Sequence, residues 1–278
     1  MKLSVNGRQA YAYTGGKPFD PQRPCVVFVH GASNDHTGFT LLARWFAHHG
    51  HAVLAVDLPG HSRSEGPPLP SVEAAADCLL ALLDAAGVQR AALAGHSMGS
   101  LIALEAAARA PERATALVMI GTAYPMQVSE TLLSTAASDP LRAMRMVNAW
   151  SISSPATKPG YPSPGNWLHG GALALARRVQ DAAPAGSNVF LHDFQVCNAY
   201  RGGLEAAARV TCPVTMVLGR QDQMTPPRAT REITAALKAR VVMVGSGHHL
   251  MGEAPDEVLN AVRGALTLPD RAPQPSAA

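Results

Sequence analysis

Charge is scarce in this chain of 278 residues: Asp, Glu, Lys and Arg make up 15% of it, whereas 47% of the residues are hydrophobic. Such a composition excludes a solvated, disordered chain and provides enough apolar surface for a buried core. The net charge is only +3, and the lysines and arginines are scattered without a basic stripe, so we expect no nucleic-acid partner. No apolar run reaches the ~20 residues that cross a bilayer, so we expect no membrane association.

Cysteine is also rare, and its four positions form no C-x-x-C pair and no Cys/His spacing of a zinc site. These positions lie far apart, at Cys25, Cys78, Cys197 and Cys212. The first residues contain neither an apolar signal core nor a cleavage site. We therefore expect reduced thiols, a cytoplasmic location, and neither a metal nor an organic cofactor. A homodimer is compatible with this composition.

What the sequence does contain is a G-x-S-x-G pattern, Gly95–Gly99, between a short apolar run and an alanine-rich segment, Ser100–Arg109, that is typical of a helix. A serine on a tight turn from strand to helix has a strained backbone that exposes its hydroxyl, and the flanking glycines allow close packing. The alternative is an ordinary turn serine. The context favours Ser97 as a nucleophile.

A serine nucleophile needs a base and a group that orients the base. Asp222 follows the apolar run 214–219, and His248 follows the β-branched run 241–244, so both are expected where parallel strands end. Asp222 has two alternatives, a solvated turn aspartate or replacement by Asp57. His249 is the alternative to His248.

Four segments together resemble the α/β-hydrolase superfamily, as a serine hydrolase or esterase-like member. They are the H-G loop 30–32, the loop 57–64 with its D-x-P-G pattern, the elbow 95–99, and the ending 247–255 with its G-H-x(4)-E-x-P pattern. The resemblance implies the order Ser97, Asp222, His248 for the catalytic residues. It also implies a mostly parallel, twisted central sheet with helices on both faces, and an inserted, mainly helical cap.

The chain is predicted to fold as one α/β core with an insertion. Strands and helices alternate over residues 25–121 and again from 210 to about 268, which indicates a parallel sheet. Residues 124–204 show no buried strand and contain a proline-rich loop, so we assign the core to 1–123 and 205–268 and the cap to 124–204. The tail 269–278 is expected to be disordered.

Charge that develops on a carbonyl oxygen under attack needs two N–H donors about 3 Å away. We expect the backbone N–H of Met98 in the elbow and that of Ala32 after the H-G loop to supply them. Ser33 lies beside Ala32 and can add a donor. His30 is interpreted as a structural histidine that joins loops.

The cap can shape a substrate pocket over the serine. Its apolar residues have two interpretations, as lining of that pocket or as packing of the cap's own small core. Candidates for the pocket are Ser33, Met126, Met144, Trp150, Trp167 and His249. The adjacent polar residues His192 and Asp193 are interpreted as local hydrogen bonding.

We therefore expect a serine hydrolase that cleaves a small, fairly apolar carboxylic ester through an acyl-enzyme. The resemblance leaves a C–C bond hydrolase of ring-cleavage products open, and also a thioesterase, lactonase or perhydrolase with the same residues. A different class is a receptor-like ligand-binding protein of this fold with slow turnover. In each case the partner is a small molecule.

Overall fold

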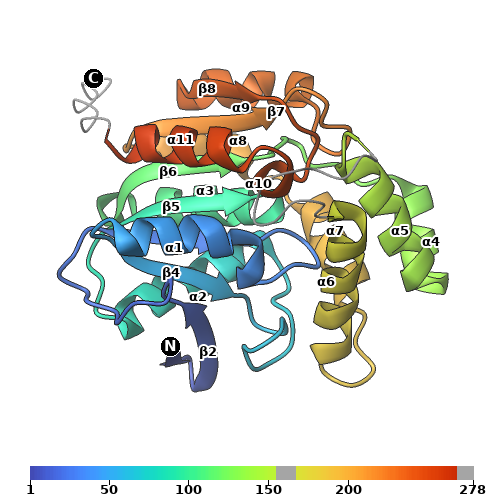
Figure 1. Ribbon diagram of the computed structural model, residues 1–278, viewed down its shortest axis with the longest axis horizontal. Helices are drawn as coiled ribbons and strands as arrows, with labels where there is room; N and C mark the ends of the chain where they lie inside the picture. The colour runs from blue at the N-terminus through green and yellow to red at the C-terminus, as the bar shows by residue number, and fades with distance from the viewer. Residues whose placement is uncertain (155–166, 268–278) are drawn as a thin grey trace.

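The computed structural model describes residues 1–154 and 167–267 (Figure 1). The predicted disordered tail, 269–278, and the proline-rich loop predicted in the cap lie outside the described residues.

Eight strands in the described residues form one sheet with the order β1-β2-β4-β3-β5-β6-β7-β8. The strands are β1 (Lys2–Val5), β2 (Arg8–Tyr13), β3 (Cys25–Val29), β4 (Ala52–Asp57), β5 (Ala91–His96), β6 (Ala114–Ile120), β7 (Val214–Gly219) and β8 (Arg240–Val244). The first two strands pair antiparallel, as do β2 and β4, and all later pairs are parallel. The predicted mostly parallel sheet is confirmed.

Helices cover both faces of this sheet, which explains why every residue of β3, β4, β5 and β7 is buried. Alternate residues of a strand point to opposite faces. In β3, Val26 and Phe28 pack against α1 (Thr40–His48) and α11 (Pro255–Leu266), on the near face in Figure 1. Val27 and Val29 belong to the opposite core, which α2 (Val72–Ala85) and α3 (Met98–Arg109) cover.

The same opposite core includes residues of α8 (Gly203–Arg209) and α9 (Arg231–Leu237), and α8 packs against α3. The remaining short elements are α10 (Leu250–Glu253), η1 (His36–Phe39), η2 (Pro111–Arg113) and η3 (Pro227–Thr230).

Among the described residues, the segment predicted as a cap contains four helices that precede α8: α4 (Glu130–Ser138), α5 (Pro140–Ser151), α6 (Leu168–Ala182) and α7 (Val189–Ala199). They lie together beyond the carboxyl ends of the strands (Figure 1). Leu132, Met144, Phe190 and Phe194 give this segment a small apolar core of its own. Among the helices of the described residues, none is both long and apolar enough to cross a membrane.

Candidate active site

Ser97 occupies a strained turn between β5 and α3. Its φ of +52° lies in the left-handed region that residues with side chains rarely adopt. A Cβ on Gly95 would lie 2.0 Å from the Gly99 carbonyl oxygen, and one on Gly99 would lie 2.1 Å from that of Val29, so neither position accepts a side chain. The Ser97 N–H donates to the Ile120 carbonyl at 2.9 Å, which ties the turn to β6. The turn therefore has the geometry that the G-x-S-x-G pattern predicts.

Asp222 and His248 come together from the loops after β7 and β8. The Nδ1 atom of His248 lies 2.8 Å from Oδ2 of Asp222, and both residues are buried. Burial alone would raise the pKa of Asp222, but His248 and the donors of Thr225 outweigh it and hold the pKa at about 2. Because an ionised carboxylate only accepts, Nδ1 of His248 carries a proton, and Nε2 is the ring nitrogen that remains to act as a base.

Thr225 is a part of this arrangement that sequence reasoning missed. Its hydroxyl donates to Oδ2 of Asp222 at 2.7 Å and lies 3.0 Å from Nδ1 of His248. The backbone N–H groups of Met224 and Thr225 donate to the other carboxylate oxygen, each at 2.8 Å. The aspartate is thus fixed by four donors, counting His248. A Thr three residues after an Asp at a strand end was the available signal.

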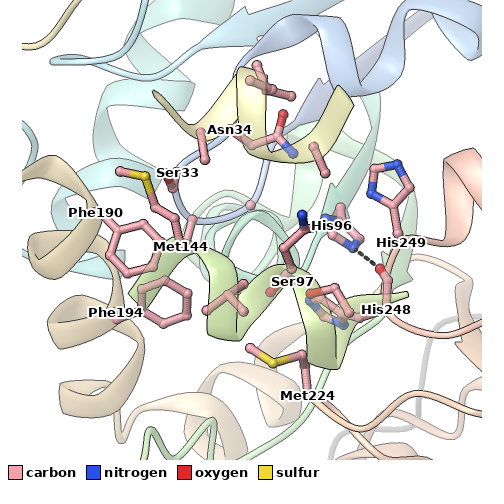
Figure 2. Close-up of a pocket in the computed structure, with 18 residues that line it drawn as sticks. Ser33, Asn34, His96, Ser97, Met144, Phe190, Phe194, Met224, His248 and His249 are labelled. Carbon is pink, nitrogen blue, oxygen red and sulfur yellow. Dashed lines mark hydrogen bonds between the residues drawn. The ribbon is translucent and has the colours of Figure 1, made fainter. Parts of the chain in front are cut away.

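Ser97 and His248 line the same two cavities, and Figure 2 shows them side by side. Within residues 1–154 and 167–267, the Ser97 hydroxyl makes no hydrogen bond of ordinary length. A hydrogen bond from a nucleophilic serine to its base is often long before substrate binds and shortens in the complex. The structure thus gathers the three residues predicted as Ser97, Asp222 and His248 at one edge of the sheet.

His96, the residue before Ser97, ties the loop of His248 to the elbow. Its Nε2 donates to the His248 carbonyl oxygen at 2.9 Å, the dashed bond in Figure 2. A carbonyl can only accept, so the proton is on Nε2. Burial lowers the pKa of His96 to about 3, and the neighbouring His248 adds to this. His96 is therefore a neutral donor at physiological pH.

His249 lies beside His248 but makes no recorded bond to Asp222, so the geometry separates the two candidates for the base. It precedes α10 and lines the cavity over Ser97. Burial lowers the pKa of His249 to about 4, with smaller contributions from His248 and His169. The ring is therefore neutral at physiological pH.

One predicted backbone donor, Met98, lies in the elbow, and the other, Ala32, lies in the loop after β3. Met98 is the first residue of α3, where N–H groups have no partner in the helix. Among the described residues, the N–H groups of Met98 and Ala32 have no protein acceptor. A Cβ on Gly31 would lie 3.1 Å from the Ser97 Cβ, which shows how closely the loop of Ala32 passes the serine.

His30 orients the peptide group that carries the Ala32 N–H. Its Nδ1 lies 2.9 Å from the Gly31 carbonyl, and its Nε2 accepts from the Leu58 N–H at 3.0 Å. Burial, followed by the nearby His61, lowers the pKa of His30 to about 4, so it is neutral. His30 joins two loops, as predicted. Because a peptide is planar and trans, holding the Gly31 carbonyl also directs the Ala32 N–H the opposite way.

Two cavities flank Ser97. The first, of about 100 Å³, is lined by the predicted residues Ser33, Met144 and His249, and the second, of about 180 Å³, by Met126 and Trp150. Sequence reasoning did not name Phe190, Phe194 and Met224. Of these, Phe194 and Met224 line both cavities.

Trp167 differs from the expectation. It is 65% exposed, lines neither cavity beside Ser97, and rests on Gly170, where an added Cβ would lie 2.3 Å from its ring. It precedes α6, and its ring lies over the first turn of that helix.

None of the described residues that line the two cavities is Asp, Glu, Lys or Arg. The lining is mainly apolar, with amide, hydroxyl and imidazole groups. These cavities therefore suit a neutral, largely apolar molecule.

Elsewhere, Asp35, His36 and Asp57 place ligand-type atoms within 4.8 Å of one another. Protein donors already use them. Asp57 accepts from the His36 N–H at 2.8 Å and lies 2.7 Å from Nδ1 of His36, and Asp35 accepts from Thr37 and Arg178. Hydrogen bonding accounts for this cluster: Asp57 binds His36 and the Arg63 N–H, and the carboxylate beside His248 is that of Asp222.

The chain is similar to several known proteins. The chain is 29% identical to the "Putative carbamate hydrolase RutD" of Klebsiella pneumoniae over 246 aligned residues. This alignment covers 82% of this chain and 85% of that protein. It is 37% identical over 99 residues to the "Putative non-heme haloperoxidase" of Mycobacterium phage D29, but spans only 36% of that relative. The crystal structure of the enol-lactonase from Burkholderia xenovorans superposes with a TM-score of 0.80 at 21% identity, covering 96% of this chain and all of the other. The model of the alpha/beta hydrolase family matches residues 26–261, so the chain belongs to that family.

Proposed function

We propose that this hydrolase cleaves a small, neutral carboxylic ester, with Ser97 as nucleophile. The observation that carries the proposal is the 2.8 Å contact between His248 Nδ1 and Asp222 Oδ2 beside Ser97 on its strained turn. A carboxylate that holds one ring nitrogen leaves the other as a base for the serine.

The reaction follows from these groups. Ser97 attacks the carbonyl carbon while His248 Nε2 takes the hydroxyl proton, and Asp222 stabilises the imidazolium. The oxygen of the tetrahedral intermediate binds the N–H groups of Met98 and Ala32. His248 then gives its proton to the leaving alcohol. Water, activated by the same ring, releases the acid and restores Ser97.

Among the described residues that line the two cavities there is no Asp, Glu, Lys or Arg, which favours a neutral ester over the anionic dienol substrate of a C–C hydrolase. No Lys or Arg among these lining residues could pair with such an anion. A two-sided ester also fits two cavities that are both lined by Ser97, with the acyl group in one and the alcohol group in the other.

Two relatives suggest other acyl bonds for the same machinery. One is named as a carbamate hydrolase and one as an enol-lactonase. Both bonds place a carbonyl next to a leaving oxygen or nitrogen, and the steps above apply to them without change. They belong in the substrate panel beside simple esters.

The test compares the wild type with Ser97→Ala on p-nitrophenyl acetate and butyrate, a lactone, a carbamate ester and a dienol ring-cleavage product. We expect a burst of p-nitrophenol followed by steady turnover for the wild type, and neither for Ser97→Ala with unchanged folding. Ester turnover that survives in Ser97→Ala would refute the nucleophile. A burst without turnover would favour the receptor-like alternative.

A further inference from the structure

Asp193 in α7 connects the cap segment to two core loops. Its side chain is buried, and one oxygen, Oδ2, accepts the Ser33 N–H at 2.8 Å and lies 2.9 Å from Nε2 of His61. The partners are 160 and 132 residues away in the chain, so this contact forms only when the cap segment lies on the core. The interpretation of Asp193 as local hydrogen bonding is wrong.

His61 and Asp193 form a buried ion pair. Nδ1 of His61 lies 3.1 Å from the Pro59 carbonyl and Nε2 faces the carboxylate, so both ring nitrogens meet acceptors and both carry protons. Burial would lower the pKa of His61, but Asp193 raises it above its ordinary value. Burial would raise the pKa of Asp193, but the neighbouring His61, together with the Ser33 N–H donor, holds it well below its usual range.

The carboxylate acts on a strained piece of backbone. Ser33 has a φ of +53°, an unfavourable conformation for a serine, and its N–H is the group that Asp193 holds. On the other side of Ala32, His30 holds the Gly31 carbonyl. Ala32 therefore lies between two fixed points, and its own N–H has no acceptor among the described residues.

We propose that Asp193, held by His61, is a positioning residue that keeps the Ala32 N–H directed at the carbonyl oxygen of the substrate. The proposal rests on the proposed function, because it assigns to Ala32 the role of oxyanion donor. It also makes the docking of α7 a condition for efficient catalysis. Loss of the carboxylate frees Ser33 to relax from its strained conformation, and the Ala32 N–H turns away.

A second contact between the cap segment and the core supplies a matched control. Arg178 in α6 pairs with the buried Asp35 at 2.7 Å and donates to the Thr37 hydroxyl at 3.0 Å. It binds side chains only and makes no recorded contact with Ser33 or Ala32. Arg178→Ala removes a cap-to-core ion pair and leaves the oxyanion loop in place.

The experiment measures kcat, KM and the rate of Ser97 labelling by a fluorophosphonate, whose phosphoryl oxygen also occupies the oxyanion site. For Asp193→Ala we expect kcat and the labelling rate to fall about 10- to 100-fold, with KM changed less than about threefold, the signature of a misplaced transition-state donor. Asp193→Asn keeps an oxygen acceptor but loses the charge that pairs with His61, so kcat and the labelling rate are expected to fall about three- to tenfold, less than in Asp193→Ala. Arg178→Ala should stay within about twofold of the wild type in both rates.

The outcomes are distinct. Equal losses in Asp193→Ala and Arg178→Ala, or a change confined to KM, would overturn the positioning role. Thermal melting of both variants shows whether activity follows stability instead. If Asp193→Ala does not fold, Asp193→Asn decides: no more effect than Arg178→Ala on kcat and labelling overturns the proposal. If the wild type is neither labelled nor active, the proposed function fails as well. If the wild type is labelled normally and substitution of Asp193 changes neither kcat nor the labelling rate, this inference alone fails.

Discussion

Nε2 of His96 donates to the backbone carbonyl of His248 at 2.9 Å, so the residue before the candidate nucleophile fixes the loop of the candidate base. The two rings lie 4.8 Å apart and are tilted at 43°. This bond joins the elbow after β5 to the loop after β8. It sets the spacing of Ser97 and His248 by backbone geometry rather than by a direct side-chain bond.

Removal of that donor should reduce catalysis. In His96→Ala the buried carbonyl of His248 loses its partner and the loop can move, so we expect kcat to fall about tenfold or more. His96→Gln keeps an N–H at a similar reach and should recover most of the rate. Steady-state kinetics on p-nitrophenyl butyrate measure both variants, and an unaffected His96→Ala would show that the loop is held by other contacts.

The four donors around Asp222 predict a graded series. Asp222→Asn removes the charge that orients His248 and should lower kcat about 10⁴-fold, as when the carboxylate of a serine triad becomes an amide. Thr225→Val removes one of several donors to Asp222 and should cost only about 2- to 10-fold. Pre-steady-state acylation rates measure both. Similar losses for the two variants would contradict the ranking.

The two cavities predict separate control of the two halves of an ester. Met144 lines only the cavity of about 100 Å³, and Met126 only that of about 180 Å³. Met144→Ala and Met126→Ala should each extend the preferred chain length on one side of the carbonyl, at a cost of about 2–5 kcal/mol in stability. A matrix of esters that varies acyl and alcohol length reads this out. Both variants altering the same side would contradict the division.

Protonation should make the free energy of unfolding depend on pH with a known sign. His30, His96 and His249 have folded pKa values of about 4, 3 and 4, against 6.5 for the free side chain. The unfolded chain therefore binds more protons between pH 6.5 and 4, and the free energy of unfolding falls as the pH falls through that range.

His61 acts in the opposite sense, because its pKa is raised. Its stabilisation is complete below pH 6.5 and is lost as the pH rises through the folded value. Urea denaturation from pH 4 to 8 should thus give a maximum near neutrality. His249→Gln should flatten the acid side, and an acid side as steep as that of the wild type would argue against a neutral His249.

The sequence predicts the residues of the site whose signals are local. Ser97 is flanked by Gly95 and Gly99, which stand where close packing leaves no room for a side chain. Asp222 and His248 each follow an apolar run. The run before Asp222, Val214–Gly219, is a strand with the predicted bounds, and the run before His248 lies within β8. A fully buried strand has a continuous apolar pattern that few other elements share.

Contacts that depend on how the cap segment packs were not predictable in this way. Asp193 acts on Ser33 across 160 residues, and α7 itself was not recognised as a helix. For Trp167 the prediction was wrong in the opposite way. Its large apolar side chain favoured a place in the pocket, but its position just before α6 leaves it exposed. A polar residue among Phe190, Phe194 and Val196 was the one signal that Asp193 offered.

The most direct test of the central claim is labelling by a fluorophosphonate, followed by mass spectrometry of the peptides, in the wild type and in His248→Ala. The account predicts an adduct on Ser97 in the wild type and none in His248→Ala over the same time. An adduct on another residue, or equal labelling of Ser97 in the two proteins, would contradict it.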